Sequence, residues 1–194
     1  MFVAGASGVI GVRLVPLLVA TGHVVAGMTR TAEKAPSLRL LGAEPVVCDV
    51  YEREALREAV VAFGPDVVLH ELTDLPDEER LIGELAAANI RMRREGTANL
   101  IAAARAAGAR RILAQSIAWD VDGERDAAKA ELERAVLAAG GVVLRYGRFY
   151  GPGTYYEDDP PPPPRVHVDD AARRTVELLD AESGVVTIAE PAAA

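Results

Sequence analysis

The chain has 194 residues, of which 50% are hydrophobic and 26% charged, and its formal net charge is −8 at pH 7. This length fits one domain with a buried core, and an acidic chain without a long basic run excludes nucleic acid as an expected partner. A single cysteine, Cys48, excludes an intrachain disulfide.

No apolar run approaches the ~20 residues of a membrane span, and no basic-then-apolar leader precedes the first strand. We therefore expect a cytoplasmic protein with no membrane contact, and we predict no metal site.

Short apolar strands alternate with helices along the chain. Because these strands are apolar on both faces, the pattern predicts a parallel sheet covered by helices on each side, a doubly wound α/β Rossmann fold. The predicted strands are 1–4, 24–28, 45–48, 67–70, 111–114, 142–144, 166–168 and 185–188. The predicted helices are 10–21, 52–63, 78–107, 126–139 and 169–179, and residues 30–41 are helix or loop.

The last third of the chain is less regular. A turn is expected at 151–153, and the proline run 160–164 can form neither a helix nor a paired strand. We therefore divide the chain into a Rossmann domain, 1–145, and a reduced substrate-binding portion with a closing helix and strand, 146–194.

The first strand leads into a glycine-spaced turn and then into an apolar helix, an order that builds a phosphate cradle. The first glycine permits a sharp turn, the second lets backbone N–H groups approach a diphosphate, and the third lets the helix pack close to the sheet. The N-terminal end of that helix then points at the phosphates. A structural turn without a ligand is the alternative. The predicted dinucleotide-binding residues of this turn are Gly5, Ser7, Gly8, Val9, Ile10 and Gly11.

The end of the second strand faces the adenosine ribose in such a fold. An acidic residue there binds the 2′-hydroxyl, whereas an arginine favours a 2′-phosphate. The chain has Thr29-Arg30 at this place, so Arg30 is predicted to bind the 2′-phosphate and to favour NADP. A solvated loop arginine is the alternative.

Two further residues end strands at the same edge of the predicted sheet. Asp49 follows the third strand and is placed to accept a hydrogen bond from the adenine amino group, although an ordinary strand-ending aspartate is also consistent. His70 ends the fourth strand and is interpreted as a satisfied structural or cofactor-adjacent group in preference to a base.

Five ordered segments together resemble the extended short-chain dehydrogenase/reductase superfamily, in its NAD(P)-dependent epimerase/dehydratase group. They are GASGVIG, GTANLIAAARAAGARRI, QSIAW, LRYGRFYGPGT and VHVDDAA. The resemblance implies a nicotinamide cofactor, NADP or NAD, and a small C-terminal substrate region. It also implies a homodimer formed through two long helices, near 84–107 and 126–139 here.

The family's redox chemistry implies a serine or threonine, a tyrosine, and a lysine four residues after the tyrosine. Ser116 and Lys129 match the serine and the lysine and are the predicted catalytic residues. Arg125 stands where the tyrosine is expected, and Arg93 replaces an asparagine of the preceding helix. An arginine stays protonated and cannot exchange a proton with an alcohol near neutral pH.

These residues predict an NADP-preferring oxidoreductase or isomerase of the epimerase/dehydratase type, acting on a small hydroxylated, carbonyl or sugar-like substrate. One alternative is a regulatory or sensor protein that binds the cofactor without turnover. Another is a tyrosine-less reductase that uses a proton donor carried by the substrate. The stretches 119–126 and 158–165 are also shorter than the family's usual substrate loops.

Overall fold

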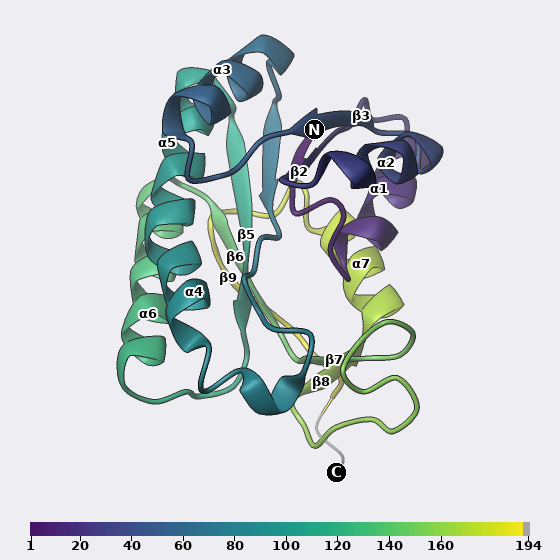
Figure 1. Cartoon of the computed structure of the whole chain (residues 1–194), viewed down its shortest axis with the longest axis vertical. Coiled ribbons are helices and arrows are strands. Elements are labelled where there is room, and N and C mark those ends of the chain that lie inside the picture. The colour runs from purple at the N-terminus through teal and green to yellow at the C-terminus, as the bar shows by residue number, and fades with distance from the viewer. Residues whose placement is uncertain (192–194) are drawn as a thin grey trace.

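A sheet of seven parallel strands forms the centre of the computed structural model, which describes residues 1–191 (Figure 1). The strand order is β3-β2-β1-β4-β5-β6-β9, so successive crossovers run outward from β1 in both directions and make the fold doubly wound. The apolar strand pattern thus correctly predicts the fold class. The strands are β1 (Phe2–Ala4), β2 (Ala26–Thr29), β3 (Glu44–Val47), β4 (Val67–His70), β5 (Arg111–Ile117), β6 (Val142–Tyr146) and β9 (Gly184–Ile188).

Helices cover both faces of the sheet (Figure 1). One layer consists of α1 (Gly11–Ala20), α2 (Ala35–Leu40) and α7 (Val168–Glu177). The other consists of α3 (Arg53–Phe63), α4 (Ala86–Arg91), α5 (Thr97–Ala106) and α6 (Gly123–Ala138).

Strand β5 shows why the strands are apolar on both faces. Ile112 and Ala114 pack in the core beneath α3, α5 and α6, whereas Leu113 packs in the core beneath α1, α2 and α7. Side chains alternate along a strand, so the central part of a strand between two helical layers must be apolar on both faces.

The helix expected over 78–107 is wrong at its start. Only a 3-10 turn, Glu79–Leu81, forms before α4 begins at Ala86, and a π-helical turn, Met92–Gly96, then joins α4 to α5. The hydroxyls of Tyr155 and Tyr156 bond to the Pro76 carbonyl and the Glu79 carboxylate. These contacts tie the segment before α4 to the turn of the C-terminal portion.

The C-terminal portion has elements both outside and inside the sheet. The pattern did not predict β7 (Arg148–Tyr150), which pairs in parallel with β8 (Arg165–His167) beside the proline run. Helix α7 then packs on α1, and β9 pairs with β6. Part of the segment 146–194 therefore completes the sheet of the segment 1–145. The segment 30–41 was expected to be helix or loop. It forms a 3-10 turn, Ala32–Lys34, followed by α2.

Candidate functional site

The glycine-rich turn between β1 and α1 is closely packed. Gly5 has φ +92°, and a Cβ on it would lie 2.6 Å from the carbonyl oxygen of Glu71. A Cβ on Gly11 would lie 2.2 Å from the Gly5 carbonyl oxygen, and the Gly8 N–H donates to that same oxygen at 2.9 Å. Close backbone approach therefore requires glycine at the first and third positions.

The same turn presents backbone amides at the sheet edge. Among residues 1–191, no protein acceptor bonds to the N–H groups of Ser7, Val9 and Ile10. The turn is tied to β2 by a hydrogen bond of 3.1 Å from Ser7 Oγ to Thr29 Oγ1. It lies after β1, where the strand order reverses, so free amides and the positive end of α1 meet at the place where such folds bind nucleotides.

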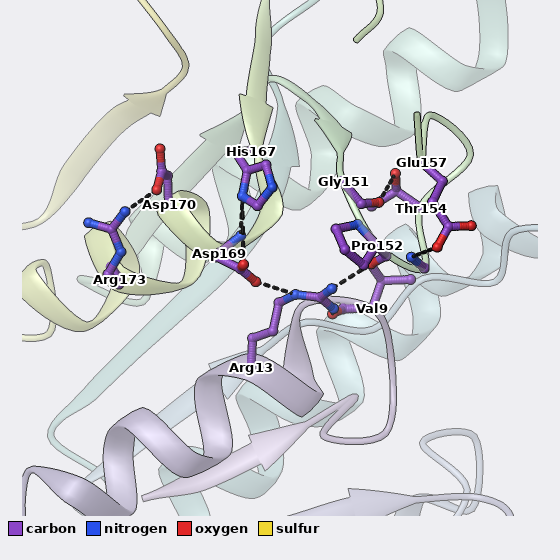
Figure 2. Close-up of polar contacts among 11 residues, drawn as sticks. Val9, Arg13, Gly151, Pro152, Thr154, Glu157, His167, Asp169, Asp170 and Arg173 are labelled. Atoms are coloured by element: carbon purple, nitrogen blue, oxygen red, sulfur yellow. Dashed lines mark hydrogen bonds and ion pairs between the residues drawn. The ribbon is translucent and has the colours of Figure 1, made fainter. Parts of the chain in front are cut away.

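Arg13 joins this turn to the C-terminal portion, as Figure 2 shows. Its guanidinium donates to the Val9 carbonyl at 2.7 Å and to Asp169 Oδ1 at 2.6 Å, and it also bonds to the Pro152 carbonyl. One side chain from the first turn of α1 thus fixes the phosphate cradle against the start of α7 and the turn after β7. No motif in the sequence pointed to Arg13.

His167 has a structural role at the start of α7. Its Nδ1 accepts the N–H of Asp169 at 3.3 Å and caps the helix (Figure 2). A Cβ on Gly151, which has φ +101°, would lie 2.5 Å from the His167 Nε2, so glycine lets the turn pass the ring.

At the predicted adenosine end, Arg30 forms an ion pair with Asp74. Nη2 of Arg30 lies 3.1 Å from Asp74 Oδ1, and this hydrogen bond raises the pKa of the guanidinium. Asp49 Oδ1 accepts the N–H of Tyr51 at 2.9 Å, which leaves the second carboxylate oxygen as an acceptor. The charge of Asp49 also contributes to the raised pKa of Arg30, so the two residues lie near each other at this end. Asp74 is a partner that the sequence did not indicate.

His70 is fully buried and does not present its ring to the sheet edge. Its Nε2 lies 2.9 Å from Thr97 Oγ1, its Nδ1 accepts the Leu72 N–H at 3.3 Å, and burial lowers its pKa to about 4. The interpretation as a satisfied structural group fits this geometry. The assignment of the side chain as a direct cofactor contact does not, because both ring nitrogens are engaged inside the protein.

Glu71 is a buried carboxyl that the sequence analysis did not single out. The residue is 4% exposed, and burial raises its pKa to about 8, which favours the neutral carboxyl at pH 7. Its Oε1 lies 3.3 Å from the Tyr146 hydroxyl, which is 2.7 Å from Thr175 Oγ1. Its Oε2 is buried without a hydrogen-bond partner among the described residues.

Ser116, a predicted catalytic residue, is buried beneath α6. Its hydroxyl donates to Glu133 Oε1 at 2.6 Å, and Arg145 forms two further hydrogen bonds to the same carboxylate, at 2.9 and 2.6 Å. Burial opposes the charge on Glu133, but the bonds from Arg145 and Ser116 prevail and lower its pKa. This burial does not fit the expected catalytic role of Ser116, because its hydroxyl is bonded to Glu133 inside the protein. Ala118 is the next position of the same parity towards the sheet edge, and it has no hydroxyl.

Lys129, the other predicted catalytic residue, lies one helical turn before Glu133 on α6. It is 7% exposed, and its Nζ donates to the Trp119 carbonyl at 3.1 Å in the loop after β5. The structure therefore brings Lys129 closer than Ser116 to the carboxyl edge of the sheet. Nearby, burial lowers the pKa of Arg93, whose Nη1 is buried and without a partner in the described part of the chain.

The tyrosines do not supply the missing acid. The hydroxyl of Tyr146 is buried, and those of Tyr150, Tyr155 and Tyr156 bond to Glu190, Pro76 and Glu79. The fifth, Tyr51, lies at the adenosine end under the guanidinium of Arg91, 3.8 Å from the ring centroid. The described residues therefore offer no free tyrosine hydroxyl at the end of the site where the nicotinamide is expected. Arg125 does not replace it, because an arginine does not exchange a proton near neutral pH.

The cradle at the switch point and the charged adenosine end define a dinucleotide-binding Rossmann protein. The chain belongs to the NAD(P)H-binding family, whose model matches residues 5–143. A family domain that binds nicotinamide nucleotides fits the close-packed glycines and free amides of the turn, so the cofactor is a nicotinamide dinucleotide.

Curated relatives include reductases. The chain is 41% identical over 225 aligned residues to a 3-diazoavenalumate denitrifying reductase of Streptomyces sp., and the match covers 94% of this chain and 73% of the relative. It is 35% identical over 112 residues to a 4-hydroxy-2-methyl-3-oxo-4-farnesyl-3,4-dihydroquinoline-1-oxide ketoreductase of Stigmatella aurantiaca, covering 58% and 31% of the two chains.

Solved structures share the fold. A UDP-glucose 4-epimerase of Thermus thermophilus in complex with NAD has a TM-score of 0.80 at 20% identity, covering 97% of this chain and 76% of its own. The Thermotoga maritima UDP-glucose 4-epimerase with UDP-glucose has a TM-score of 0.79 at 16% identity, with the same coverage. The expected likeness to the epimerase/dehydratase group is confirmed.

Across residues 1–191, no helix has the length and apolar character needed to cross a bilayer. The same residues contain no cluster of three or more His, Cys, Asp or Glu side chains arranged to hold a metal ion.

Proposed function

We propose that the chain is an NAD(P)H-dependent reductase that prefers NADPH and whose substrate needs no proton from the protein. The supporting observation is that no group at the expected catalytic positions is free to donate a proton. Arg125 occupies the tyrosine position, and Ser116 donates to Glu133. Reduction of a ketone forms an alkoxide that a side chain must protonate, whereas some electrophiles release their product without proton transfer.

An aryl diazonium ion is such an electrophile, and the name of the Streptomyces relative describes a denitrifying reductase that acts on a substrate with a diazo group. When bound, the reduced nicotinamide supplies a hydride with its two electrons. In a diazonium substrate the hydride forms a C–H bond at the carbon that carries nitrogen. The C–N bond breaks, its electron pair leaves with N2, and no proton moves.

The residues of this chain hold and orient the reactants in this proposal. The amides of Ser7, Val9 and Ile10 bind the diphosphate, Arg30 binds the 2′-phosphate, and the second oxygen of Asp49 accepts the adenine amino group. Lys129 would donate hydrogen bonds from its ammonium group, now bonded to the Trp119 carbonyl, to the hydroxyls of the nicotinamide ribose.

The test compares substrates that differ in their need for a proton. The purified chain is incubated with NADPH and either an aryl diazonium salt or the ketone of matching size. We expect NADPH consumption with equimolar N2 release from the diazonium salt and no alcohol from the ketone. Ketone reduction at a comparable rate would overturn the proposal.

A second candidate is a sensor that binds the cofactor without turnover, and the same engaged groups favour it. Tight NADPH binding with no consumption in the presence of either substrate is the result that selects it. Oxidation of a sugar hydroxyl, as an epimerase requires, receives less support, because that reaction needs a base at the position of Arg125.

We also propose that two copies pair through the helices near 84–107 and 126–139. The run from α4 to α5 and helix α6 correspond to these segments and pack against each other within one chain. Sedimentation velocity at several protein concentrations tests this proposal.

A further inference from the structure

The ion pair between Arg30 and Asp74 spans the place where the adenosine half of the cofactor is expected. Arg30 follows β2 and Asp74 lies in the loop after β4, and these strands flank β1 on its two sides. The pair therefore crosses the edge of the sheet beside the glycine-rich turn. Its atoms are 3.1 Å apart, and the Asp74 side chain is the less exposed partner, at 23% against 59%.

Asp74 is held in place from its own side of the pair. Its backbone N–H donates to Asn89 Oδ1 at 3.2 Å, which fixes the loop to α4. A carboxylate on a fixed backbone is a permanent feature of this end of the site, whereas the long, exposed Arg30 side chain retains the freedom to turn to another anion.

The second arginine at this end is also paired with a carboxylate. Arg91 donates to both oxygens of Glu95, at 2.7 and 3.2 Å, while it covers the ring of Tyr51. Both arginines at this end, Arg30 and Arg91, are thus paired with a carboxylate, and neither is free to bind a 2′-phosphate. An incoming dianion must either take Arg30 from Asp74 or share it with a like charge.

We propose that Asp74 is a specificity-determining residue that competes with the cofactor's 2′-phosphate for Arg30. With NADPH, the phosphate can bind Arg30 only after the ion pair between Arg30 and Asp74 opens, so the preference that Arg30 confers is reduced. With NADH, the ion pair stays intact, and Asp74 is available to accept a hydrogen bond from the 2′-hydroxyl, as an acidic residue does in NAD-specific folds. This inference rests on the proposed role of Arg30.

The test is a set of cofactor dissociation constants for the full chain and its variants Asp74→Asn, Arg30→Ala and the double variant. We expect Asp74→Asn to tighten NADPH binding about tenfold and to leave NADH binding unchanged or weaker. In the Arg30→Ala background, Asp74→Asn should have little effect on NADPH. Lys34→Ala, which removes an exposed cation four residues from Arg30, is the matched control and should change the ratio of the two constants little.

Equal effects of Asp74→Asn on NADPH and NADH would overturn the inference. So would a gain in NADPH affinity that persists without Arg30, because it would show a general charge effect in place of competition. If Arg30→Ala leaves NADPH binding unchanged, the proposed role of Arg30 fails, and the inference fails with it. If Arg30→Ala weakens NADPH binding but Asp74→Asn changes nothing, only the role of Asp74 fails. Thermal unfolding of each variant checks that the fold is retained.

Discussion

Ser116 donates a 2.6 Å hydrogen bond to Glu133, whose carboxylate also receives two bonds from Arg145. This arrangement commits the serine hydroxyl to the interface between β5 and α6. Ser116 is therefore a structural partner of a buried anion. It lies two residues before Ala118, which is the position of the same parity at the sheet edge.

Ser116→Ala should therefore lower stability and leave catalysis unchanged. Removing one donor to a buried carboxylate costs about 1–3 kcal/mol of unfolding free energy. Urea denaturation measures this loss of stability. Turnover at saturating substrate should stay within about twofold of the wild-type rate, whereas removal of a catalytic acid or base lowers the rate about a hundredfold or more. A loss of turnover in a variant of normal stability would restore the catalytic assignment.

Glu71→Gln should remove a pH dependence of stability. The folded pKa is about 8 and the ordinary value is 4.5, so between these values the folded chain holds a proton that the unfolded chain has lost. The free energy of unfolding then falls by about 1.4 kcal/mol per pH unit as pH rises through this window. The free energy of unfolding of the variant, relative to that of the wild type, should be highest near pH 8 and lowest near pH 4.5. Urea denaturation at several pH values across this range measures the difference.

His70 acts in the opposite direction over part of that range. Its folded pKa of about 4 lies below the ordinary 6.5, so its contribution to stability is lost as pH falls from 6.5 towards 4. The comparison of wild type with Glu71→Gln cancels this term because both proteins contain His70. A stability difference that does not change with pH would contradict a neutral buried Glu71.

Arg13→Ala should release the turn that contains Pro152 from the phosphate cradle. Amide hydrogen exchange in residues 151–157 should become faster, and NADPH binding should weaken several-fold because Val9 loses its anchor. Arg173→Ala is a suitable control, since Arg173 pairs with Asp170 on the exposed side of α7 (Figure 2). Equal exchange rates in the two variants would remove the linking role of Arg13.

Gly11→Ala should abolish cofactor binding or folding. The added methyl group would lie 2.2 Å from the Gly5 carbonyl oxygen and 2.7 Å from the backbone of Ala6, and backbone atoms cannot move aside as a side chain can. Gly83→Ala meets nothing within 4 Å and should be tolerated. Calorimetric titration with NADPH and circular dichroism distinguish loss of binding from loss of fold.

The periodic elements could be predicted from the sequence because their cause is local. Apolar runs such as 67–70 identify strands between two helical layers, and the glycine spacing of 5–11 identifies a turn that approaches its neighbours closely. Strand β7 is short, at three residues, and depends on its pairing with β8, which lies across the proline run. Such a partner is not encoded near the strand itself.

The side-chain roles were less accessible because they depend on which face of an element is covered and by what. Ser116 has the residue type and the sequence context of a catalytic serine, but its parity on β5 directs it towards Glu133 on α6. Asp74 and Arg13 act through partners 44 and 156 positions away. Glu71 differs from any exposed glutamate only by its burial, which a single sequence does not reveal.

The pairing of β9 with β6 has a consequence for how this chain is made. During synthesis, strands β1 to β6 leave the ribosome well before residues 184–188. The backbone groups of β6 that later pair with β9 therefore have no partner strand while the polypeptide grows. An open apolar strand of this kind is a site for misassociation between nascent chains. Early termination within α7 should thus yield aggregates in place of a smaller native protein.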